Sequence, residues 1–202
     1  MKMIRIATCV AVVAVGTVAA ASAHAATISY DAALSGPSES PPNASLATGF
    51  VTVDVDTTAN TMHVHVIFSG LLGTTTASHI HSATAAPFTG TAGVATTSPS
   101  FTGFPLGVTS GTYDNTLDLT LASSYNSAFV TANGGTTASA ETALLAGIAA
   151  GEAYLNIHTS VVPGGEIRGF LIPAPEPSTA TLGVLGSLGL AAWGWRRRKR
   201  PA

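Results

Sequence analysis

Cysteine is almost absent from this chain of 202 residues. The one cysteine, Cys9, lies in an apolar stretch near the N-terminus, too early to be a lipoprotein acylation site, and residues 26–175 contain none. This absence excludes a disulfide framework in the region between the two ends. About 150 residues are enough for one domain with a hydrophobic core, which then has to supply the stability.

Basic residues are equally scarce once the two ends are set aside. Seven of the eight Lys and Arg residues are Lys2, Arg5 and the five residues of 196–200, which leaves Arg168 alone in residues 26–175. Nine carboxylates in the same region give it a net charge of −8 with histidine neutral. Nucleic acid is excluded as a partner, because contacts to phosphate require clustered cations. Direct binding of an anionic polysaccharide is disfavoured unless a metal ion bridges the two.

The N-terminus has the three parts of a secretory signal peptide. Lys2 and Arg5 form a positive segment, residues 6–20 are apolar, and Ala23-His24-Ala25 provides a site of the small-x-small type. We expect cleavage after Ala25, with cleavage after Ala23 as an alternative and an uncleaved anchor as the competing interpretation. Residues 1–25 are thus predicted to direct export.

The C-terminus carries a second handling signal. Pro175-Glu176-Pro177 precedes an apolar run at 181–195, and basic residues follow it at 196–200. A run of about 15 residues is near the lower limit for crossing a hydrocarbon core of ~30 Å, and its basic end is expected on the cytoplasmic side. This order resembles the PEP-CTERM sorting signal of Gram-negative bacteria, in which an exosortase, a membrane protease, cuts near the Pro-Glu-Pro motif. The resemblance implies that residues 174–202 anchor the protein transiently in the inner membrane before it reaches the cell surface or the exterior.

Residues 26–173 are predicted to form an all-β domain. Apolar and polar residues alternate at 50–56 and 62–68, with a hairpin turn at 57–60 between them. One short helix is expected near 139–149. Short strands without alternating helices favour an antiparallel Greek-key-like sandwich or small barrel. Further strands are expected at 27–35, 77–82, 116–121, 152–158 and 166–172.

Histidines carry the candidate chemistry. Two His-x-His pairs, His63/His65 and His79/His81, fall on predicted strands, so each pair lies on one face. Two imidazoles two residues apart on a strand are a common beginning of a copper or zinc site. The first pair is expected on an ordinary solvated face, because the hairpin places Asp54 opposite His63.

A second hairpin adds a fifth histidine and the arginine. If it closes symmetrically about Val162, His158 lies opposite Glu166 and Asn156 lies opposite Arg168. We therefore predict a patch of these four residues. The metal hypothesis takes His79, His81 and His158 as ligands, with Glu166 as a fourth ligand or as their support; the alternative is a metal-free polar network that holds loops.

Three motifs together resemble the CHRD domain, a family named from the developmental protein chordin and frequent in exported bacterial proteins. They are Leu34-Ser35-Gly36 with Glu39-Ser40-Pro41-Pro42; Ser78-His79-Ile80-His81; and the stretch from Ala153-Tyr154-Leu155 to Ile167-Arg168-Gly169. The resemblance covers residues 27–172. It departs at Phe170, where the family usually has glutamine, and it is poor over 83–135. The family has no firmly assigned activity, so the resemblance implies a fold more than a function.

Two functions follow as hypotheses. The first is a non-enzymatic structural or interaction module of the envelope or matrix, with an exopolysaccharide or envelope component as partner and no catalytic residues. The second is an extracytoplasmic copper- or zinc-binding domain. Its His-x-His pair on a strand is similar to the copper ligands of Cu,Zn superoxide dismutases, although the disulfide and the zinc loop of those enzymes are missing here.

Overall fold

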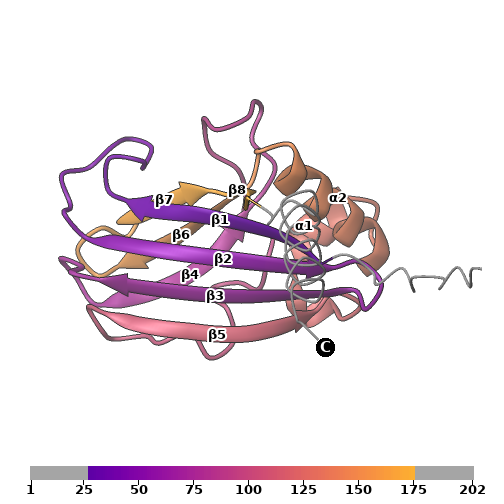
Figure 1. Ribbon diagram of the computed structural model, residues 1–202, viewed down its shortest axis with the longest axis horizontal. Helices are drawn as coiled ribbons and strands as arrows, with labels where there is room; N and C mark the ends of the chain where they lie inside the picture. Colours follow the sequence, from indigo (N-terminus) through magenta and orange to yellow (C-terminus); the bar gives the residue numbers. More distant parts are fainter. Residues whose placement is uncertain (1–26, 176–202) are drawn as a thin grey trace, which may run out of the picture.

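The computed structural model describes residues 27–175. The expected signal peptide and the apolar run at 181–195 lie outside the described residues, as do Glu176 and Pro177 of the sorting motif. Among the described residues, no helix is long and apolar enough to cross a membrane. The domain consists of one curled antiparallel sheet with helices at one end (Figure 1).

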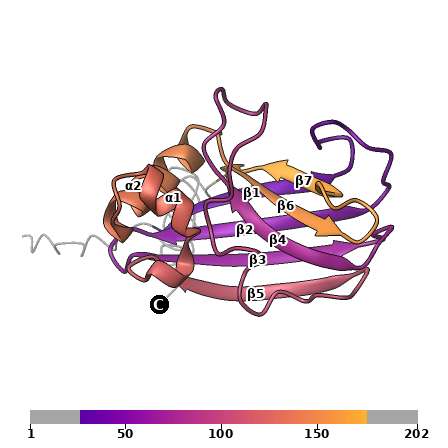
Figure 2. The same ribbon diagram turned by 180° about the vertical axis from the view of Figure 1, so that it is seen from behind.

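The sheet has the order β4-β6-β7-β1-β2-β3-β5, with β8 paired to β1. Seen from behind, β4 and β6 form the wall that faces the reader, with β1 to β3 beyond them (Figure 2). The predicted all-β antiparallel fold is confirmed, and the strand expected at 116–121 lies earlier, at 111–118. The strands are β1 (Ile28–Ser35), β2 (Thr48–Asp56), β3 (Thr61–Ser69), β4 (Thr75–His81), β5 (Gly111–Asp118), β6 (Tyr154–Thr159), β7 (Ile167–Phe170) and β8 (Ile172–Pro173).

Alternation of side chains builds the core from β2 and β3. Val51, Val53 and Val55 are 0 to 2 % exposed, whereas the residues between them are only half-buried. The register places Asp54 opposite His63, as predicted. Apolar residues of the inner face therefore meet inside the curl of the sheet, and polar residues cover its outer face.

The helices close one end of the curl. The predicted helix is α2 (Thr137–Ala149), which begins with a capping box between Thr136 and Ser139 and buries Leu144 and Ile148. Gly151, at φ 71°, follows its end. Two shorter elements precede it, a 3₁₀ turn η1 (Ala122–Ser124) and α1 (Ser127–Ala132), neither of which the apolar pattern predicted.

A long segment between β4 and β5 has little regular structure and packs over the sheet. Ala95 and Thr96 donate backbone hydrogen bonds to Ile80, and Phe101 donates one to Ser78. The Tyr113 hydroxyl on β5 donates to the Thr102 carbonyl at 3.4 Å. This segment therefore connects the two edge strands, and it supplies backbone groups to the outer side of β4.

Candidate metal centre

Three adjacent strands place the candidate residues in rows. His79 on β4 pairs with Asn156 on β6, which pairs with Arg168 on β7. The next row is His81, Tyr154 and Phe170. Residues between them, such as Ile80 and Leu155, are 0 % exposed in the core. The polar residues consequently share the opposite face of the same strands, and the predicted pairing of Asn156 with Arg168 is confirmed.

His79, His81 and His158 converge in this face. Each histidine contributes one ring nitrogen to a group of three nitrogens that all lie within 4.8 Å of one another. The Nε2 atoms of His79 and His158 are 3.0 Å apart. The ring centroid of His79 lies 4.6 Å from that of His81 and 4.7 Å from that of His158. The structure thus brings together the three predicted histidine ligands.

The other ring nitrogen of each histidine is held by the backbone. Each Nδ1 lies within hydrogen-bond distance of a carbonyl oxygen, and a carbonyl only accepts, so each Nδ1 carries the proton. This leaves the lone pair of every imidazole on Nε2. The acceptors are Pro99 for His79 at 2.8 Å, Ala92 for His81 at 2.8 Å and Pro163 for His158 at 2.9 Å.

The convergent Nε2 atoms lack donors. His81 Nε2 is buried without a hydrogen-bond partner, and the 3.0 Å contact between His79 and His158 brings two lone pairs together. Burial, together with the neighbouring histidines, lowers the pKa of His79 and of His81 from 6.5 to about 4, and burial lowers the pKa of His158 as well. The three rings are therefore neutral at pH 7, which is the form that coordinates a metal.

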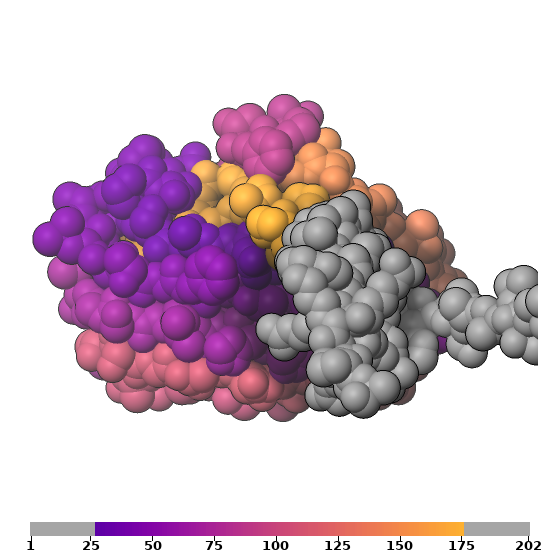
Figure 3. Space-filling view, viewed as in Figure 1, coloured from indigo at the N-terminus to yellow at the C-terminus, as the bar shows by residue number. Residues whose placement is uncertain are grey.

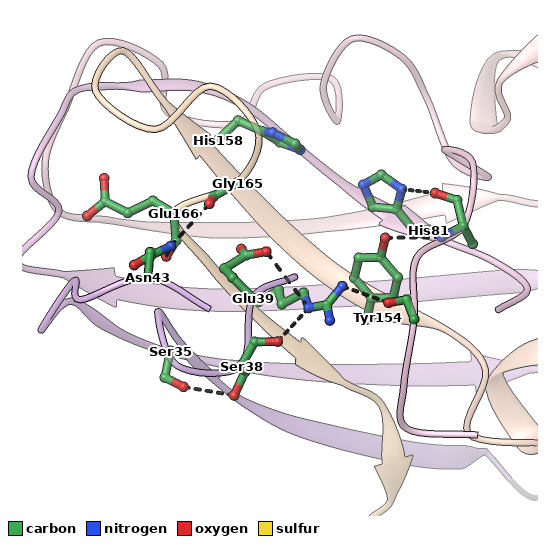
Figure 4. Close-up of polar contacts among 12 residues, drawn as sticks. Ser35, Ser38, Glu39, Asn43, His81, Tyr154, His158, Gly165 and Glu166 are labelled. Atoms are coloured by element: carbon green, nitrogen blue, oxygen red, sulfur yellow. Dashed lines mark hydrogen bonds and ion pairs between the residues drawn. The ribbon is translucent and has the colours of Figure 1, made fainter. Parts of the chain in front are cut away.

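Glu166 lies outside this group. Its side chain points away from His158 (Figure 4), and its carboxylate accepts hydrogen bonds from Thr159 Oγ1 at 2.7 Å and from three groups of two other loops. Burial alone would raise the pKa of Glu166, but these bonds outweigh it and hold the pKa below its usual value. Glu166 thus fixes loops. The other three donors are Ser45 Oγ at 2.7 Å, Leu72 N at 2.7 Å and Gly73 N at 3.4 Å.

Arg168 forms a buried ion pair that the sequence did not indicate. Its Nε donates to the Ser38 carbonyl at 2.6 Å and lies 3.8 Å from Glu39 Oε2, and its Nη1 donates to the Gly90 carbonyl at 3.0 Å. Burial raises the pKa of Glu39 to about 7, against the opposing charge of Arg168. In Figure 3 the yellow-orange end of the chain lies between the indigo β1–β2 loop, which carries Ser38 and Glu39, and the magenta segment after β4, which carries Gly90.

Tyr154 links the ion pair to the histidines. The ring of His81 stacks on Tyr154 at a centroid distance of 4.7 Å and an interplanar angle of 9°. The guanidinium of Arg168 lies 4.7 Å from the centroid of the same tyrosine. The sequence does not show that Tyr154 contacts a candidate ligand, because this contact depends on the packing of β4 against β6.

The first His-x-His pair stays on the solvated face. His63 lies between Asp114, at 2.8 Å from its Nε2, and Asp54, at 3.6 Å from its Nδ1. Its hydrogen bond to Asp114 raises the pKa of His63. Its two nitrogens face different carboxylates, and in the part of the chain that the structure describes, the one group of three that could hold a metal is on β4 and β6.

Comparison with known protein families identifies both parts of the chain. A family model of the PEP-CTERM protein-sorting motif matches residues 173–199, and a family model of the CHRD domain matches residues 30–171. No curated protein and no solved structure matches the chain. The sorting motif marks an exported protein that an exosortase-type membrane enzyme processes, and the domain indicates an extracellular module. The chain belongs to the CHRD domain family.

Proposed function

We propose that this domain binds one metal ion, copper or zinc, outside the cytoplasm through the Nε2 atoms of His79, His81 and His158. The observation that carries this proposal is a group of three ring nitrogens within 4.8 Å of one another, in rings whose Nδ1 atoms already donate to carbonyls and so leave Nε2 free to coordinate. Hydrogen bonds from Nδ1 to backbone carbonyls orient metal-bound histidines and make them better donors.

The spacing suits a first-row transition metal. Nitrogens at 2.0–2.1 Å from a tetrahedral zinc ion lie about 3.3 Å from each other. The observed 3.0 Å between His79 Nε2 and His158 Nε2 is close to this value, and the third nitrogen lies within 4.8 Å. Imidazole donors suit zinc and copper, whereas calcium and magnesium require oxygen ligands.

A metal also removes the electrostatic cost of the site. Without an ion, one buried Nε2 has no partner and two others oppose their lone pairs, which costs about 1–3 kcal/mol for each unsatisfied group. Coordination turns all three lone pairs into bonds. The same three histidines are hydrogen-bonded to the segments that carry Ala92, Pro99 and Pro163, so an ion that fixes the histidines would also order the loops on this face.

Elemental analysis of protein purified without chelators tests the proposal. We expect about one copper or zinc per chain, with three nitrogen neighbours at about 2.0 Å by X-ray absorption. His79→Gln should lose the metal, whereas His65→Gln, a change in the other His-x-His pair, should keep it. Less than about 0.2 metal per chain after incubation with copper and with zinc would contradict the proposal and favour the metal-free polar network.

A further inference from the structure

The histidine cluster supplies three donors and no more. Among residues 27–175, the group of ligand atoms within mutual reach is His79, His81 and His158, without a carboxylate or thiolate. Zinc and copper in sites with three histidine ligands take four or five ligands in total, and sites with three protein ligands keep a position for water or substrate. At least one position therefore falls to a molecule from solvent.

The nearest candidates for an internal fourth ligand are already engaged. Both oxygens of Glu166 accept hydrogen bonds, which come from the β1–β2 loop, the β3–β4 loop and the end of β6. Glu39 faces Arg168 across a buried ion pair with a distance of 3.8 Å. Moving either carboxylate to the metal would leave buried donors or a buried guanidinium without a partner, which costs several kcal/mol.

Charge balance favours an anion in the open position. Three neutral imidazoles leave the full charge of a dication uncompensated in a partly buried site. Arg168, a further cation whose charge acts on the His81 ring, is buried against Tyr154. It is itself faced by the Glu39 carboxylate at 3.8 Å, so the charge left uncompensated is that of the metal ion. Water would leave this excess of positive charge in place, whereas an anion reduces it.

Access is from the side of His158. His79 is only 6 % exposed and the Nε2 of His81 has no exposed surface. His158, the last residue but one of β6, is half-buried, and its hydrogen bond to the Pro163 carbonyl lies at the surface. A ligand that reaches the metal therefore passes beside the His158 ring and the hairpin loop.

We propose that the three-histidine site holds its metal with an open coordination position on the His158 side, and that this position takes a small monodentate anion from solvent. This inference rests on the proposed metal binding and adds a ligand class to it. It makes the site one that exchanges an external ligand, in contrast to a closed structural metal site, whose protein ligands fill every position.

Spectroscopy of the metal-loaded protein tests this inference. Protein loaded with Cu(II), with its metal content measured first, is titrated with sodium azide and, separately, with neutral imidazole, while the visible and electron paramagnetic resonance spectra are recorded. We expect one azide per copper and weaker binding of imidazole by about tenfold or more, since only azide removes charge from the site. His65→Gln should give the same titration as the unchanged protein.

A second variant examines the charge argument. His158→Glu places a carboxylate among the ligands, so we expect retained copper and azide affinity reduced by about tenfold or more. Loaded protein whose spectra do not respond to azide would overturn the open position alone, and equal affinity for imidazole would overturn the preference for anions. Protein that takes up no metal at all would overturn the metal proposal itself, and the initial metal analysis separates that outcome from the others.

Discussion

Replacement of His81 by phenylalanine is expected to remove the metal while leaving the metal-free domain about as stable as before or more stable. His81 lies flat against Tyr154, at a centroid distance of 4.7 Å. Its Nδ1 donates to the Ala92 carbonyl at 2.8 Å, and its Nε2 is buried without a partner. Phenylalanine keeps the stacked ring and removes both nitrogens, so the change affects polar groups far more than packing.

The expected magnitude follows from these contacts. Removing an unsatisfied buried nitrogen stabilises the fold by about 1–3 kcal/mol, and losing the hydrogen bond to Ala92 costs about 0.5–1.5 kcal/mol. The stacked aromatic pair, worth about 0.5–1.5 kcal/mol, is retained. The free energy of unfolding of metal-free His81→Phe should therefore lie between about 0.5 kcal/mol below and about 2.5 kcal/mol above that of the unchanged protein.

Urea unfolding with and without metal measures both effects. In chelator, His81→Phe should unfold at about the same urea concentration as the unchanged protein or at a higher one. In zinc at about 100 times the dissociation constant, the unchanged protein should gain about 2.7 kcal/mol and the variant nothing. His65→Gln should behave like the unchanged protein in both. A loss of more than about 2 kcal/mol by metal-free His81→Phe would refute the reasoning, because His81 Nε2 would then have to be hydrogen-bonded in the metal-free fold.

Three further changes test other residues. Glu166→Gln should lower the free energy of unfolding by about 2 kcal/mol or more, because an amide replaces a carboxylate with four donors; elemental analysis should show unchanged metal content, and lost metal would make Glu166 a ligand. Burial raises the pKa of Glu39 from 4.5 to about 7, so protonation of Glu39 stabilises the fold fully below pH 4.5, and this stabilisation is lost as the pH rises through 7. Urea unfolding at several pH values should show that the free energy of unfolding falls by about 3 kcal/mol over this window, relative to Glu39→Gln. If the free energies of unfolding of the two proteins changed in parallel with pH, the raised pKa would be contradicted. Deleting residues 175–202 should leave a folded, soluble but mislocalised domain by circular dichroism and cell fractionation, and an unfolded product would make that segment part of the fold.

The alternation of apolar and polar residues predicts the parts of this fold that are set by residues close together in the sequence, such as hairpins. The β2–β3 hairpin has the predicted register because its turn is short and one face is apolar throughout. The same reasoning places His79 and His81 on one face and pairs Asn156 with Arg168. It brings His158 to that face as well, so the convergence of the three candidate histidine ligands follows from strand geometry alone.

Glu166 shows where this reasoning ends. The paired register of the second hairpin ends at Ile157 and Ile167, so the predicted pairing of His158 with Glu166 is wrong: the Glu166 amide donates instead to the Ile157 carbonyl at 2.8 Å. The backbone just before it does not continue as a regular strand, since Gly165 has a φ of 126° that favours glycine. The carboxylate therefore reaches Thr159, a neighbour of His158 whose side chain lies on the core side. Alternation assumes extended backbone, and it fails at the first residue after a turn.

The sequence pattern does not predict contacts between distant segments, for a different reason. The ion pair of Glu39 and Arg168 joins residues 129 positions apart in the chain. The carbonyls of Ala92 and Pro99 come from a segment rich in proline, glycine and threonine, for which no periodicity exists. Backbone carbonyls have no side-chain signature, so the groups that set the tautomers of His79 and His81 become visible only when the segment is placed over the sheet.

The buried polar atoms without partners point to the same half of the molecule. Within residues 27–175, none of them lies on β1, β2, β3 or β5, where side chains alternate regularly between core and solvent. They lie on or just after β4, on β6 and next to Arg168, and they are Glu39 Oε1, Ser78 Oγ, His81 Nε2, Ser82 Oγ and Asn156 Oδ1. Natural sequences satisfy buried polar groups almost everywhere, and the exceptions concentrate at functional sites, where a ligand or ion completes them. A metal-free network that only held loops would need its polar atoms paired with one another. The face of β4, β6 and β7 instead leaves His81 Nε2 and Asn156 Oδ1 unpaired beside three oriented imidazoles, which is the pattern expected of a site built to receive something from outside the chain.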